Sequence, residues 1–166
     1  MAEALLISRA DIVKYTSMNG NVDTDKFIQY IKIAQDTHIQ SYLGTDLLEK
    51  IKADIIAGTL AGNYLSLLTT YVKPMLIHFA MMEYLHFASW TISNKGVFRH
   101  NSENSTTATS EEINELVASE NKIAEHYAQR FVDYICNNSN LFPEYTSNSN
   151  GDMHPNNDVN YSNWYI

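Results

Sequence analysis

The chain has 166 residues, 45% of them hydrophobic, which suits a single domain that buries roughly 70% of the surface of its unfolded chain. The lone Cys136 excludes an intramolecular disulfide, and with it the framework of small disulfide-stapled secreted domains. The net charge of -8 comes entirely from residues 101–166, where ten acidic side chains face two basic ones; such a surface repels phosphate backbones, so we expect no tight nucleic-acid binding.

Helix signals begin close to the N-terminus. Ser8 is placed to cap a short helix from Arg9 to about Thr16. A second helix is expected to begin after Asp23 or Thr24 and to stop at Gly44, with a stripe of Phe27, Ile28, Ile31, Ile39 and Tyr42. Thr45 is expected to cap a third helix that ends at Gly58, with a stripe of Leu47, Leu48, Ile51, Ile55 and Ile56.

A fourth helix is predicted from about Asn63 to Trp90. Pro74 lies inside it and removes one backbone hydrogen bond, so the helix is expected to kink or split there. The stretch is long enough to span a bilayer, but it carries Lys73, His78, Glu83 and His86, which are costly in lipid. We therefore expect a core helix and no membrane segment.

A fifth helix should open at Thr109 and Glu112, which form a Thr-x-x-Glu capping box, and end near Asn137. Its apolar stripe is expected to comprise Ile113, Leu116, Val117, Ile123, Tyr127, Phe131 and Ile135. Residues 138–166 are rich in Asn, contain no Lys or Arg and show no helical period. We interpret them as an extended C-terminal arm on a helical domain of residues 1–137.

The aromatic residues of this arm are interpreted as anchors for another protein surface, because aromatic rings in an otherwise polar strand are typical of interfaces. They are Phe142, Tyr145, Tyr161, Trp164 and Tyr165.

The connection between the last two long helices, residues 92–109, is unusually long for a small domain. Residues 93–109 of this connection are polar apart from Val97, Phe98 and Ala108. A short β-hairpin within it would present an apolar tip with basic flanks, so we predict a second protein interface at Lys95, Gly96, Val97, Phe98 and Arg99. The alternative is a mobile surface loop.

Glu83 and His86 form a Glu-x-x-His pair on the fourth helix, the half-site of carboxylate-bridged di-iron bundles. A helical-bundle metalloprotein that uses these two residues is therefore an alternative function. The complete site needs a second Glu-x-x-His, and the sequence has none. The other histidines show neither a His-x-x-x-His spacing nor a cysteine partner at zinc spacing, and we find no nucleophile elbow and no phosphate-binding loop.

Several stretches together resemble the head-tail connector proteins of tailed bacteriophages, especially the ring proteins of crAss-like phages. They are KYTSMNGNVDTDKFIQYIKIAQDTHIQSYLGTDLLEKI from Lys14, YVKPMLIHFAMMEYL from Tyr71, and SNKGV followed by ENS in the long connection. The resemblance covers roughly residues 7–145. It implies an all-helical adaptor that forms a ring with copies of itself, commonly twelve-fold, docks on the portal protein, extends the DNA channel and supports the next neck ring or the tail.

From the residues and the resemblance together we expect an all-α bundle of about five helices, with no catalysis, cofactor or metal. We expect a virion protein of the head-tail junction, assembled in the cytoplasm of a bacterial host, past which DNA moves without specific binding. A small helical regulator that binds DNA or protein is a further alternative, but no basic recognition helix is present to favour it.

Overall fold

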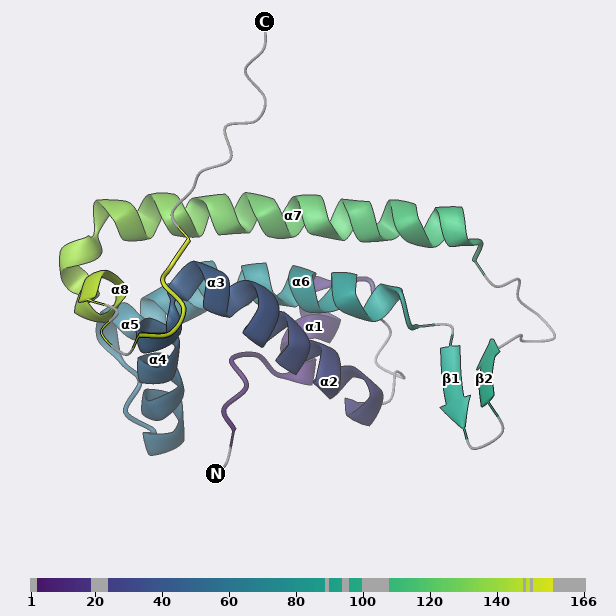
Figure 1. Cartoon of the computed structure of the whole chain (residues 1–166), viewed down its shortest axis with the longest axis horizontal. Coiled ribbons are helices and arrows are strands. Elements are labelled where there is room, and N and C mark those ends of the chain that lie inside the picture. Colours follow the sequence, from purple (N-terminus) through teal and green to yellow (C-terminus); the bar gives the residue numbers. More distant parts are fainter. Residues whose placement is uncertain are drawn as a thin grey trace, which may run out of the picture.

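A computed structural model shows an all-α bundle with one small β-hairpin (Figure 1). It describes residues 3–18, 24–88, 90–93, 96–99, 108–147, 149 and 151–156. The predicted fold class is confirmed, and each of the five expected helices is present.

The first three expected helices form with nearly the predicted bounds. α1 spans Arg9–Tyr15 and opens with a capping box in which the Ser8 N–H donates to the Asp11 carboxylate at 2.8 Å. α2 (Thr24–Ala34), a π-helical turn (Gln35–Ile39) and α3 (Gln40–Leu43) together make the second helix, and Gly44 ends it with a positive φ of 74°. α4 spans Thr45–Ala57.

The fourth expected helix is divided at its proline. α5 (Gly62–Leu67) leads into a π-helical turn (Leu68–Val72), and α6 (Lys73–Leu85) begins with Pro74 in its first turn. The Lys73 N–H donates to the carbonyl of Leu68, five residues back, which makes this turn wider than an α-helical turn. Pro74, which has no N–H to donate, follows directly after the wider turn. α6 ends at Leu85, five residues before the predicted end at Trp90.

α6 is the centre of the core, because residues on every side of it are buried. α2 and α3 lie on the near side of α6 in Figure 1, α1 on the far side, and α7 runs along its top. A helix that is apolar all round must be enclosed by other elements. The buried residues of α6 are Met75, Leu76, Ile77, Phe79, Ala80 and Met81.

α7 spans Ser110–Asn137 and opens with the expected capping box, in which the Glu112 N–H donates to the Thr109 hydroxyl at 3.2 Å. Its predicted apolar stripe is only partly buried. Phe131 and Ile135 are in the core, but Leu116 is 52% exposed and Ile123 is 38% exposed. The prediction that the whole stripe is buried is therefore wrong. Only the C-terminal half of α7 packs on the core, and its buried residues all lie at Ala124 or beyond.

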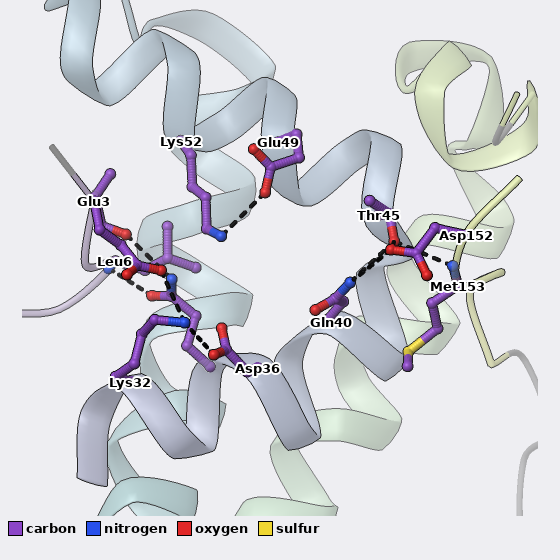
Figure 2. Close-up of polar contacts among 12 residues, drawn as sticks. Glu3, Leu6, Lys32, Asp36, Gln40, Thr45, Glu49, Lys52, Asp152 and Met153 are labelled. Atoms are coloured by element: carbon purple, nitrogen blue, oxygen red, sulfur yellow. Dashed lines mark hydrogen bonds and ion pairs between the residues drawn. The ribbon is translucent and has the colours of Figure 1, made fainter. Parts of the chain in front are cut away.

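The N-terminal segment is held to the π-helical turn after α2 through one buried side chain. The Gln35 amide group donates to the carbonyl of Ala4 at 3.1 Å and accepts from the Leu6 N–H at 3.0 Å. Gln35 is fully buried, and these two bonds satisfy both ends of its amide. An ion pair of Glu3 with Lys32, which also bonds Asp36, closes the outer side of this junction (Figure 2).

The predicted boundary between domain and arm at residues 137 and 138 is wrong. After α7 the chain turns through a 3-10 helix (Ser139–Leu141) into α8 (Pro143–Ser147) and returns to the bundle. Phe142 is fully buried and Tyr145 is 4% exposed, so neither is available as an interface anchor. The ring of Phe142 meets the ring of Tyr64 edge-on at 5.4 Å, and the Tyr64 hydroxyl donates to Glu144 at 2.6 Å.

Thr45 holds the next part of the C-terminal segment and does not cap α4. Gly44 occupies the cap position. The Thr45 hydroxyl donates to Asp152 at 3.0 Å and accepts from the Met153 N–H at 3.2 Å, and its own N–H donates to the Met153 carbonyl at 3.0 Å (Figure 2). Gln40 adds a bond of 3.0 Å to the same hydroxyl. The described residues between 138 and 156 are therefore part of the bundle, and residues 148, 150 and 157–166 lie outside the described residues.

The long connection begins with a β-hairpin. β1 (Trp90–Ser93) pairs antiparallel with β2 (Gly96–Arg99), with Trp90 opposite Arg99 and Ser93 opposite Gly96. The hairpin stands beyond the end of α6 (Figure 1).

The stretch Gly62–Leu85 is, within the described residues, long and apolar enough to cross a membrane by length and composition. Half of its most apolar part is buried inside the fold. Its polar residues have partners in the bundle: Lys73 pairs with Asp11, and Glu83 with His38. These contacts favour the interpretation as a core helix.

Replacing Phe142 tests whether residues 138–147 belong to the core. We expect Phe142→Ala to lower the free energy of unfolding by about 3–5 kcal/mol, because it leaves a cavity among Tyr64, Tyr134 and their neighbours. Leu116→Ala is the control, since Leu116 is 52% exposed on α7 and its replacement should cost at most about 1 kcal/mol. Chemical denaturation measures both values, and equal small losses would contradict the placement of Phe142.

The stability of the bundle should fall at high pH. Tyr145 is buried beside Cys136. Burial, and in second place the neighbouring Cys136, raises the pKa of the Tyr145 phenol from 10 to about 12. The folded state thus favours the neutral phenol, so its contribution to stability is complete below pH 10 and is lost as the pH rises toward 12. We expect Tyr145→Phe to lose less stability than the parent over this interval in melting curves, and an identical decline would contradict the assignment.

Candidate functional site

The base of the β-hairpin is built from the last turn of α6. The Phe87 N–H donates to the carbonyl of Tyr84 at 2.9 Å, and the Trp90 N–H donates to the carbonyl of Phe87 at 2.9 Å. Each of these bonds joins residues three positions apart, so two successive turns connect the end of α6 to β1. The hairpin is thereby fixed to the end of the central helix.

Four aromatic rings support this junction, and we call them the ring cluster: Phe27, Tyr30, Tyr84 and Phe87. Phe27 meets Tyr84 edge-on at 4.9 Å, Tyr84 meets Tyr30 at 5.5 Å, and Tyr30 stacks on Phe87 at 5.8 Å. Such pairs contribute about 0.5–1.5 kcal/mol each beyond their buried area. Burial raises the pKa of both Tyr30 and Tyr84.

The ring cluster runs from the core to the surface. Phe27 is 3% exposed, whereas Phe87 is 52% exposed. Trp90, at the start of β1, is 48% exposed. Large exposed rings at the foot of a projecting element are typical of protein interfaces. The sequence signal for them was available, since Phe87 and Trp90 follow the last buried turn of α6, but the predicted helix extended over both.

The predicted interface residues fall in three groups. Gly96, Val97, Phe98 and Arg99 form β2, whose backbone is placed but whose side chains lie outside the described residues, as does Lys95. Phe142 and Tyr145 are in the core, as described above. Tyr161, Trp164 and Tyr165 fall outside the described part of the chain.

A second surface feature is a groove on the far side of α6, which sequence reasoning missed. It has a volume of about 410 Å³ and lies between α1, α6 and α7. Its walls come from residues that are distant in the sequence: Asp11, Tyr15, Thr69, Lys73, Pro74, Ile77, His78 and Tyr127. A groove built from residues so far apart in the sequence cannot be predicted from a local sequence pattern.

Two polar pairs fix the walls of the groove. Lys73 lies 3.4 Å from the Asp11 carboxylate, and His78 Nδ1 lies 2.7 Å from the Glu120 carboxylate. Burial alone would raise the pKa of Asp11, but hydrogen bonds from Ser8 and the Lys73 cation outweigh it and hold that pKa below its usual value. The His78 ring also stacks on Tyr127 at 5.7 Å.

The Glu-x-x-His pair of α6 is not assembled into one site. His38 Nε2 lies 2.8 Å from Glu83, and the His38 ring stacks on Phe79 at 4.2 Å. The His86 side chain is exposed at the end of α6. In the described part of the chain, no group of three or more His, Cys, Asp or Glu side chains is arranged to hold a metal ion.

A family model described as a family of unknown function, DUF6712, matches residues 39–154, and the chain belongs to that family. The match begins in the π-helical turn before α3 and ends within the segment that Thr45 holds. It includes the hairpin and all of α7. No curated protein and no solved structure matches the chain.

The ring cluster should control the mobility of the hairpin. We expect Phe87→Ala to speed amide hydrogen exchange in Thr91–Ser93 and Gly96–Arg99, because the stacked contact with Tyr30 is lost. Exchange in the buried half of α7 should not change. Leu65→Ala removes an equally exposed apolar side chain from a distant helix and serves as control. Unchanged exchange in the hairpin would show that Phe87 does not support it.

Proposed function

We propose that the protein is a structural component of a phage virion, a head-tail connector adaptor. In this function it forms a ring with copies of itself, docks on the portal protein, extends the DNA channel and supports the next neck ring or the tail. It acts in the virion at the head-tail junction after assembly in the bacterial cytoplasm, and it catalyses no reaction. The proposal joins the resemblance in the sequence to the shape of the molecule.

One observation carries the proposal: in the part of the chain that the structure describes, a hairpin projects from a helical body and continues from the end of its central helix. The ring cluster joins the hairpin to the core, and the exposed Phe87 and Trp90 lie at its foot. A rigid body with a firmly based projection suits a protein whose task is to hold neighbours at set positions.

The charge of α7 agrees with a channel protein that lets DNA pass. Its first sixteen residues, Ser110–Glu125, carry Glu111, Glu112, Glu115, Glu120 and Glu125 against a single Lys122. Such a surface repels phosphate and would not retain DNA.

Strand β2 of the hairpin, in which Phe98 pairs with Thr91 near the base and not at the expected tip, provides the test. We expect Phe98→Ser to reduce incorporation of the protein into portal-bearing particles while its melting temperature stays that of the parent. The reason is that a ring at an interface buries its surface only in the complex, where it is worth on the order of 2 kcal/mol. Incorporation is measured by quantifying the protein in purified particles, beside a melting curve of the isolated variant.

Ile56→Ser is the matched control, because Ile56 is 61% exposed on α4, far from the hairpin in Figure 1. It should change neither quantity. Normal incorporation of Phe98→Ser would contradict a role for the hairpin, and a lowered melting temperature would make Phe98 part of the fold.

A further inference from the structure

Exposed apolar side chains lie in or beside the groove between α1, α6 and α7. Tyr15, on its α1 wall, is 57% exposed. Leu65 lies one turn before the wall residue Thr69, whose hydroxyl donates to its carbonyl at 2.8 Å, and is 42% exposed. Ile123, one turn before Tyr127, is 38% exposed. These three exposed side chains lie in the wall of the groove or one helical turn from it.

Cations flank the aromatic rings of this groove. Lys14 Nζ lies 5.1 Å from the centre of the Tyr15 ring, and the Arg130 guanidinium lies 5.8 Å from that of Tyr127. Lys73 stands between them in the groove wall. The Lys73 charge is paired with Asp11, and His78 is paired with Glu120, so the groove has both signs of charge. An occupant that is rich in aromatic groups and has few charges of its own would suit it.

Residues 157–166, NDVNYSNWYI, have this composition. They contain Val159, Tyr161, Trp164, Tyr165 and Ile166, and their only charged side chain is that of Asp158. Five apolar residues in ten are too few to build a core of their own, but they suit a strand that lies in a groove.

The starting point of this segment lies on the opposite face of the bundle. The Asn156 N–H donates to the carbonyl of Ser41 at 2.7 Å, beside α3. The ring of Phe79 faces this side, where it stacks on those of His38 and Tyr42. Pro74 and His78 lie on the other side of the same helix and line the groove.

Ten residues span at most about 33–36 Å when extended, which is long enough to reach an adjacent copy. In a head-to-tail ring, the α3 face of one copy meets the opposite face of the next. The segment of one copy would then start beside the groove of its neighbour.

We propose that residues 157–166 of one copy bind in the groove between α1, α6 and α7 of the adjacent copy. That the segment binds the groove of another copy rests on the proposed ring. That the segment fits the groove rests only on the residues of the segment and of the groove. Trp164 and Tyr165 supply the rings that contact Tyr15 and Tyr127.

The fit is tested by titrating the full chain into a fluorescein-labelled peptide of residues 157–166 and following the anisotropy. We expect saturable binding that weakens about tenfold or more for Tyr15→Ser in the protein or Trp164→Ser in the peptide, the loss typical of a buried aromatic anchor. Ile56→Ser removes an equally exposed apolar side chain outside the groove and should bind as the parent does. No saturable binding, or equal binding by Tyr15→Ser and the parent, would overturn the proposal.

The exchange between copies is tested by mixing two full-length variants in a Cys136→Ser background, one with Thr69→Cys in the groove and one with Asn163→Cys. On oxidation we expect a disulfide-linked heterodimer. Replacing the first variant by Glu49→Cys, whose native side chain is 60% exposed on α4, gives the control. A heterodimer no more abundant than in the control would overturn the exchange.

These measurements separate the inference from the proposed function, because they need no portal. A heterodimer formed by a protein that never enters portal-bearing particles would support the exchange and reject the connector role. Normal incorporation into portal-bearing particles without the heterodimer would support the connector role and reject the exchange.

Discussion

The burial of most of the surface of α6 is the constraint on which the rest of the structure depends. Its apolar residues point in several directions, so α1, α2, α3 and α7 pack around it, and Pro74 and His78 border the groove. Pro74 lies in the first turn of α6, where its lack of an N–H is tolerated, and the π-helical turn Leu68–Val72 comes directly before this helix. Both candidate interfaces follow from this arrangement: the hairpin continues from the last turn of α6, and the groove opens beside its first turns.

Local chemistry could be predicted from the sequence, and long-range contacts could not. The capping boxes at Ser8 and Thr109 and the stop at Gly44 depend on residues a few positions apart. Phe142 looked like an interface anchor because the segment of residues 138–166 is rich in polar residues, while the rings that pack on it belong to Tyr64 and Tyr134. The apolar stripe of α7 likewise gave no sign of where its packing surface ends.

The candidate sites show the same division. A polar connection of unusual length predicted a special role for residues 92–109, and the hairpin of residues 90–99 overlaps its first part. The ring cluster combines α2 with the end of α6, and the groove combines three helices, so neither had a signal within one segment. The family match covers the hairpin, Lys73, His78 and Tyr127. Asp11 and Tyr15, which form the α1 wall of the groove, lie before residue 39 and outside it.

Taken together, the hairpin and the groove would give one rigid body two contacts of different kinds, one toward a portal or tail protein and one toward a copy of itself. The most direct test of the connector role is native mass spectrometry of the protein mixed with the portal protein of the same phage. Our account predicts a complex in which a closed ring of this protein is bound to the portal ring, with one stoichiometry. Failure to bind the portal under conditions in which both proteins are folded would contradict it.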